Sequence, residues 1–163
     1  MKKAVLFLVF NRPRYTRQVF ECIRNAKPER LYVAADGPRS DRAEEESLCE
    51  EVRSIATNVD WPCNLKVLFQ DTNLGCRLGV SNGINWFFEH EEEGIIIEDD
   101  ILPSPGFFVF CETMLELYRN DERIMMITGT NYHPVAGDKD FFFSQYFSIW
   151  GWATWRRAWK LTT

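Results

Sequence analysis

The sequence lacks the cysteine and histidine spacing of a zinc site or of a disulfide-stabilised domain. Its five cysteines are an odd number and contain no C-x-x-C pair, and its two histidines, His90 and His133, lie far apart in the chain. Structural zinc sites use closely spaced cysteine and histidine ligands, and small secreted domains pair their cysteines in even sets. The sequence therefore gives no indication of either framework, and it favours a reducing, cytoplasmic location.

Long hydrophobic runs and an excess of positive charge are missing as well. No stretch approaches the roughly 20 apolar residues of a membrane-spanning helix. The apolar run at residues 4–10 stops at Asn11-Arg12-Pro13 without the small-residue cleavage site of a signal peptide. Nineteen Lys and Arg against 24 Asp and Glu give a formal net charge of −5. A surface that neutralises many phosphates carries net positive charge, so we expect no nucleic-acid partner. The lack of a long apolar run predicts that there is no transmembrane segment.

Internal repeats and low-complexity linkers are also absent from the sequence. A chain of 163 residues, of which 45% are hydrophobic, has the length and composition of one domain spanning 1–163. Apolar runs typical of buried parallel strands alternate with segments whose apolar residues recur at helical spacing. The alternation predicts a three-layer α/β/α domain with a mostly parallel sheet. We expect strands at 4–10, 31–35, 65–69, 95–97 and 124–128.

The strongest indication of chemistry is the acidic triplet Glu98-Asp99-Asp100, which directly follows the apolar run Ile95-Ile96-Ile97. Open α/β sheets bind their ligands at the carboxyl ends of the strands. Carboxylate oxygens at that edge suit Mg²⁺ or Mn²⁺ shared with substrate phosphates. The alternative is a solvated acidic turn.

Two further strands are expected to end in polar residues at the same edge. Asn11-Arg12 follows the first strand and Asp36 follows the second, and an arginine there suits a diphosphate while an aspartate suits a base or a ribose hydroxyl. The alternative for each segment is that its residues simply form a turn.

Neither G-x-G-x-x-G nor a P-loop motif occurs, which argues against dinucleotide-binding and P-loop folds. Asn73-Leu74-Gly75 is either a functional loop or the lead-in to a helix.

An aromatic segment, residues 146–155, contains three of the six tryptophans. Indole rings stack on the apolar faces of sugars, so a wall of such rings beside a metal site suits a carbohydrate. The alternative is that the rings cap the core.

The motifs occur in the chain order Phe10-Asn11-Arg12-Pro13, Ala35-Asp36-Gly37, Asn73-Leu74-Gly75, Ile97-Glu98-Asp99-Asp100, Ser104-Pro105-Gly106-Phe107-Phe108 and Phe147-Ser148-Ile149-Trp150-Gly151-Trp152. This order resembles the GT-A class of nucleotide-sugar glycosyltransferases, most closely the N-acetylglucosaminyltransferase I-like group and related bacterial transferases. The resemblance implies a metal-dependent transferase that uses a nucleoside diphosphate sugar, a UDP-sugar above all, and a saccharide acceptor.

The resemblance also assigns site residues. Glu98-Asp99-Asp100 looks like the variant DXD element of that group, which implies that Asp100 binds Mn²⁺ or Mg²⁺ while Glu98 and Asp99 contact the donor sugar and ribose. Asp36 matches the acid that recognises uracil, and Arg12 matches the basic residue at the nucleotide end. The complete expected donor site is Phe10, Asn11, Arg12, Asp36, Asn73, Gly75, Glu98, Asp99, Gly151 and Trp152.

No residue matches the general base of that group, which lies C-terminal to the Gly-Trp segment, so the catalytic residue stays unknown. We expect the chain to be the donor-binding half of a longer enzyme, with 141–163 as an aromatic acceptor-side segment. Residues 147–155 of this segment should then be partly exposed, which predicts self-association or a partner that covers them. If the chain transfers sugar by itself, the candidate bases are His133, Asp138 and Asp140. The alternatives are a non-catalytic nucleotide-sugar or partner-binding module and a sugar nucleotidyltransferase, although the latter normally has a Gly-rich basic loop after its first strand.

Overall fold

The computed structural model describes residues 1–132 and 141–162 and contains a six-stranded sheet in the order β3-β2-β1-β4-β6-β5. The strands are β1 (Ala4–Val9), β2 (Arg30–Ala35), β3 (Asn64–Phe69), β4 (Glu93–Glu98), β5 (Met126–Thr128) and β6 (Trp152–Trp155). The helices are α1 (Pro13–Ala26), α2 (Glu45–Ala56), α3 (Gly75–His90), α4 (Pro105–Leu117) and the short α5 (Arg156–Trp159). The expected α/β class with a mostly parallel sheet is confirmed.

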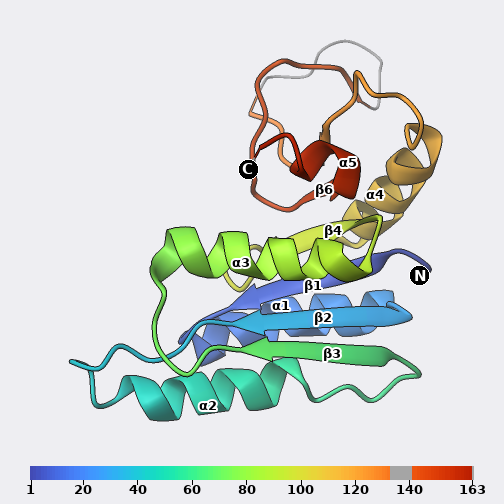
Figure 1. Ribbon diagram of the computed structural model, residues 1–163. Helices are drawn as coiled ribbons and strands as arrows, with labels where there is room; N and C mark the ends of the chain where they lie inside the picture. Colours follow the sequence, from blue (N-terminus) through green and yellow to red (C-terminus); the bar gives the residue numbers. More distant parts are fainter. Residues whose placement is uncertain (133–140, 163) are drawn as a thin grey trace.

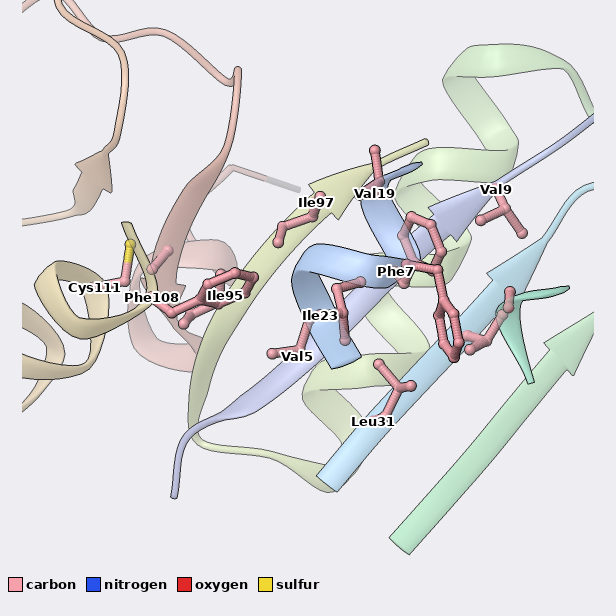
Figure 2. Packing of buried hydrophobic residues seen from close by; sticks show 14 of the residues in the cluster. Val5, Phe7, Val9, Val19, Ile23, Leu31, Ile95, Ile97, Phe108 and Cys111 are labelled. Atoms are coloured by element: carbon pink, nitrogen blue, oxygen red, sulfur yellow. The ribbon is translucent and has the colours of Figure 1, made fainter. Parts of the chain in front are cut away.

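Helices cover both faces of the sheet, with α3 in front and α1 behind in Figure 1. Helices α1, α2 and α4 share the larger buried cluster with the sheet, whereas α3 packs on the smaller cluster of the opposite face. Figure 2 shows Val19 and Ile23 of α1 beside Val5 and Phe7 of β1. All six residues of β1 are buried, because β2 and β4 flank this central strand and helices cover both faces of the sheet to which its side chains point. The three layers follow directly from this packing.

Strand β6 was not predicted from the sequence. It is contributed by the aromatic segment and pairs antiparallel with both β4 and β5. All four residues of β6 are buried, so the strand has no alternation of polar and apolar residues by which the sequence could reveal it. The fifth expected strand is present as β5, but it lies at the edge beyond β6.

Glycine allows α3 to pack closely on the sheet. A Cβ atom built on Gly83 would lie 2.8 Å from Cδ2 of Leu8. Helix α3 ends at His90, and Gly94 belongs to β4. There the ring of Phe87 takes the space of a side chain, because a Cβ atom on Gly94 would lie 2.3 Å from Cζ of Phe87.

The strand order reverses at one place along the carboxyl edge of the sheet, the junction between β1 and β4. The chain runs from β1 to β2 to β3 in one direction, then returns through α3 to β4 on the other side of β1. The strand order therefore reverses between β1 and β4, and the carboxyl ends of these two parallel strands are neighbours. Within the described residues, no helix is long and apolar enough to cross a membrane.

Candidate functional site

The junction between β1 and β4 holds an acid–arginine cluster made of Arg12, Asp99 and Asp100. Arg12 follows β1, and its guanidinium donates from Nη2 to Asp99 and from Nη1 to Oδ2 of Asp100 at 2.8 Å. The backbone N–H of Phe10 donates to the other oxygen of Asp99 at 3.3 Å. Asp99 is 2% exposed, whereas the side chains of Arg12 and Asp100 are nearly half exposed. One cationic side chain thus joins a buried carboxylate to an exposed one.

Glu98 does not join this cluster. Ile95 and Ile97 of β4 belong to the larger core cluster and Ile96 to the smaller one, so strand alternation places Glu98 on the α3 side of the sheet. Burial raises the pKa of the Glu98 carboxyl, and the charges of Asp100 and Asp99 raise it further. Burial also raises the pKa of Asp99, although Arg12 and the N–H of Phe10 oppose this change.

A divalent cation at this cluster would have few protein ligands. In the described part of the chain, no three His, Cys, Asp or Glu side chains gather in a way that could hold a metal ion by themselves. Asp100 nevertheless presents a half-exposed carboxylate of which only Oδ2 is hydrogen-bonded within the described residues. Mg²⁺ is commonly held by one or two carboxylates while substrate phosphates and water complete its shell. Asp100 is the residue that would hold such an ion here.

Asp36 has a role within the fold that the sequence did not reveal. Its carboxylate accepts four hydrogen bonds, from the N–H groups of Gly37, Leu74 and Gly75 at 2.8–3.1 Å and from Nδ2 of Asn73 at 3.0 Å. Gly75 begins α3 with φ of 77°, a conformation that favours glycine. The carboxylate therefore satisfies free N–H groups at the start of α3 and ties the loop after β3 to the end of β2.

This arrangement predicts that Asp36→Ala lowers the free energy of unfolding. Loss of the carboxylate leaves several partly buried donors unpaired, which should cost about 1–3 kcal/mol. The measurement is urea unfolding, with Asp71→Ala as the matched control because Asp71 is an exposed acid of the same loop region. A loss in Asp36→Ala no larger than in Asp71→Ala would contradict the structural role of Asp36.

Asn11, Arg39 and Glu45 form a second group of contacting side chains. Only Asn11 was predicted from the sequence as a site residue, whereas Arg39 and Glu45 were missed. The buried Glu45 accepts hydrogen bonds from Nδ2 of Asn11 at 3.0 Å and from the backbone N–H of Arg39 at 3.0 Å, and it forms an ion pair with the Arg39 guanidinium. The guanidinium lies 5.6 Å from the ring centre of Phe10. Glu45 thereby fixes the positions of both Asn11 and Arg39. The sequence gives no signal for this, because Glu45 stands within the acidic run Glu44-Glu45-Glu46.

The Arg39 contacts predict a pH dependence of stability. Hydrogen bonds from Arg39 lower the pKa of Glu45 to about 2, whereas an unfolded glutamate titrates near ~4.3. The unfolded state binds more protons between these values, so this stabilisation is complete above about pH 4.5 and is lost as the pH falls towards 2.

Glu45→Gln should therefore be less stable than the parent at pH 7 and should lose less stability between pH 4.5 and 2. Chemical unfolding at a series of pH values measures the difference, with the exposed neighbour variant Glu46→Gln as control. Parallel pH profiles for Glu45→Gln and the parent would show that the Arg39–Glu45 contact does not stabilise the fold.

The aromatic segment divides into buried and exposed rings. Trp152 is 4% exposed and packs in the smaller core cluster beside Trp159, with 6.3 Å between ring centres, so its ring is not open to a ligand in this structure. Gly151, at φ of 69°, accepts a hydrogen bond from the N–H of Gly129. Tyr146, Phe147, Ile149 and Trp150 are between 49% and 88% exposed. The expected partial exposure is therefore observed for residues 146–150, whereas β6 belongs to the core.

Other predicted positions lie elsewhere. His133, Asp138 and Asp140 fall outside the described residues. Two open hollows on the surface, one next to Lys3 and Glu116 and one between α1 and α2, contain none of the predicted site residues.

No protein-family model matches the chain, and no curated protein matches it by sequence. Among solved structures, the chain is similar to 4-diphosphocytidyl-2C-methyl-D-erythritolsynthase from Anaerococcus prevotii DSM 20548, with a TM-score of 0.48 and 10% sequence identity. The match covers 95% of this chain and 71% of that chain.

Proposed function

We propose that the chain is the donor-binding domain of a metal-dependent glycosyltransferase, which binds a nucleoside diphosphate sugar, most favourably a UDP-sugar, and transfers the sugar to a saccharide acceptor. The observation that carries the proposal is the position of the acid–arginine cluster. It lies where the strand order reverses, outside the carboxyl ends of β1 and β4. Open α/β sheets bind nucleotides at this kind of junction.

The charges of the cluster suit the two ends of a diphosphate–metal complex. Arg12 offers a planar guanidinium, which pairs with phosphate oxygens through two parallel hydrogen bonds. Asp100 offers its half-exposed carboxylate for Mn²⁺ or Mg²⁺, and a bound cation would supply neutralisation of the charge on the leaving diphosphate. Arg12 would contribute to the same neutralisation from the protein side.

The neighbouring residues would bind the rest of the donor. Asn11 and Phe10 follow the central strand β1, and the loop of Asn73 and Gly75 is held against the end of β2 through Asp36. The four hydrogen bonds within the chain fill the roughly four acceptor sites of the Asp36 carboxylate and make it a support for a nucleoside pocket, so contact with uracil would require one of these bonds to give way. The exposed rings of Tyr146, Phe147 and Trp150 would offer stacking surfaces for sugar.

The experiment is a thermal-shift series with UDP, CTP, GDP and ADP, each with Mn²⁺ and with EDTA. The proposal predicts the largest rise in melting temperature with UDP and Mn²⁺. A response to CTP with none to any diphosphate would favour a nucleotidyltransferase instead. No response to any nucleotide with Mn²⁺ would contradict the proposal.

A further inference from the structure

The contact with Glu45 fixes which end of the Asn11 amide group is free. Nδ2 of Asn11 donates to Oε1 of Glu45 at 3.0 Å, and the buried Glu45 carboxylate is also paired with Arg39. An ionised carboxylate only accepts hydrogen bonds, so the amide oxygen of Asn11 cannot replace Nδ2 at this position. The two ends of an amide group have nearly the same shape, and its hydrogen-bond partners decide its orientation. Glu45 therefore sets the orientation of the Asn11 side chain.

The amide oxygen of Asn11 is available to a ligand. In the part of the chain that the structure describes, no donor pairs with this oxygen, and it is not one of the buried polar atoms without a partner, so solvent reaches it. Asn11 is the second residue after β1 and lies at the carboxyl edge of the sheet. Because Nδ2 is already bonded to Glu45, Asn11 offers a ligand a hydrogen-bond acceptor.

Asp36, the acidic residue at the end of the neighbouring strand β2, has no such free acceptor. Its carboxylate accepts four hydrogen bonds from within the chain, which fill its roughly four acceptor sites. The two strands pair in parallel, and the N–H of Asp36 donates to the carbonyl of Val9 at 3.2 Å, so both residues follow strands that end at the same edge. Asn11 can accept a new hydrogen bond without breaking a contact within the chain, whereas Asp36 cannot.

We infer that Oδ1 of Asn11 accepts a hydrogen bond from an N–H or O–H group of the nucleoside, and that Glu45 is the positioning residue that keeps this oxygen free. The ligand half of the inference rests on the proposed function, whereas the orientation of the amide rests on the Glu45 contact alone. Uridine has donors of this kind in the imide N–H of its base and the hydroxyls of its ribose. Asn11 then takes the recognition role that the resemblance gave to Asp36.

The first arm of the test measures, by NMR and without ligand, how fast the side-chain amide protons of Asn11 exchange with water. In the parent they should exchange about 10-fold or more slowly than those of Asn120, an exposed asparagine beyond the end of α4, because a hydrogen bond to a carboxylate protects them. Glu45→Gln should remove most of this protection, since a neutral glutamine both donates and accepts. The Asn73 amide should not change, because it donates to Asp36 and Gly37. Asn11→Ala identifies the Asn11 signals.

The second arm compares by calorimetry the affinity for UDP with that for 2′-deoxy-UDP, 3′-deoxy-UDP and N3-methyl-UDP, each of which lacks one donor. In the parent, one analogue should bind about 10-fold more weakly than UDP, and in Asn11→Ala the same pair should bind within about 2-fold of each other. Glu45→Gln should lower the ratio as well, and the control Asn120→Ala should keep it. The ratio is the readout because a merely structural change weakens UDP and its analogue alike. Circular dichroism checks the fold of each variant, and if Glu45→Gln is unfolded, the comparison of Asn11 with Asn120 in the parent decides the orientation.

Amide exchange at Asn11 as fast as at Asn120 in the parent would overturn the fixed orientation. The same ratio of affinities in Asn11→Ala and in the parent, or no analogue weaker than UDP, would overturn the ligand contact. Equal weakening of UDP and its analogue in Glu45→Gln would make Glu45 a structural residue only. Slow exchange at Asn11 in a protein that binds no nucleotide would support the orientation and contradict the proposed function together with the ligand contact, so the two failures are distinguishable.

Discussion

Replacement of Asp100 by alanine should remove the Mn²⁺-dependent part of nucleotide stabilisation while the ligand-free protein stays folded. A ligand at about 100 times its Kd stabilises a protein by ~2.7 kcal/mol, which corresponds to about 5–10 °C in melting temperature for a domain of this size. Asp100 is the exposed carboxylate of the acid–arginine cluster, and its pair with Arg12 is worth at most about 1 kcal/mol. The ligand-free variant should therefore melt close to the parent.

The measurement compares melting temperatures with UDP alone and with UDP and Mn²⁺. Asp71→Ala is the matched control, because it removes one exposed carboxylate from the same edge of the sheet outside the cluster. A full Mn²⁺-dependent shift in Asp100→Ala would remove Asp100 from the cation site. A large loss of stability without ligand would make Asp100 a structural residue instead.

Phe87→Ala should cause the largest loss of stability, because this ring joins α3 to the sheet. Phe87 is fully buried, it packs edge-on against Tyr32 with 5.0 Å between ring centres, and it occupies the space above Gly94. Removal of a buried phenylalanine ring typically costs about 3–5 kcal/mol, through lost burial and the cavity that remains.

Urea unfolding measures this cost against Leu78→Ala, which shortens a half-exposed side chain on the same helix and should change stability by no more than about 0.5 kcal/mol. If Phe87→Ala were within 1 kcal/mol of the parent, α3 would not be packed on the sheet as described. The loop of Asn73 and Gly75, which leads into α3, would then have no fixed position in the site.

The parallel half of the fold could be predicted because its elements follow simple periodic patterns. The apolar runs at β1, β2 and β4 come from strands buried on both faces, and α4 begins at Pro105 as the Ser104-Pro105 pair indicates. Strand β6 could not be predicted in this way. Its pairing with β4 and β5 depends on contacts between distant segments, and its buried aromatic residues look the same in a strand, a core loop or a binding wall.

The site was predictable only to the level of strand ends. The positions of Arg12 and Asp99 after neighbouring strands follow from the α/β alternation, and the structure brings these two side chains together. The separation of Glu98 from them depends on strand alternation at the last residue of β4. The roles of Asp36 and Glu45 depend on which backbone N–H groups the loops present, and no spacing in the sequence encodes that information.

The most direct test of the account is the affinity of the intact chain for UDP, measured by calorimetry in EDTA and in saturating Mn²⁺. We predict saturable binding at one site, with Mn²⁺ increasing the affinity about 10-fold or more, since a cation and a cationic side chain would both neutralise the diphosphate. No detectable UDP binding under either condition, or equal affinity with and without Mn²⁺, would contradict a metal-assisted nucleotide site at the junction of β1 and β4.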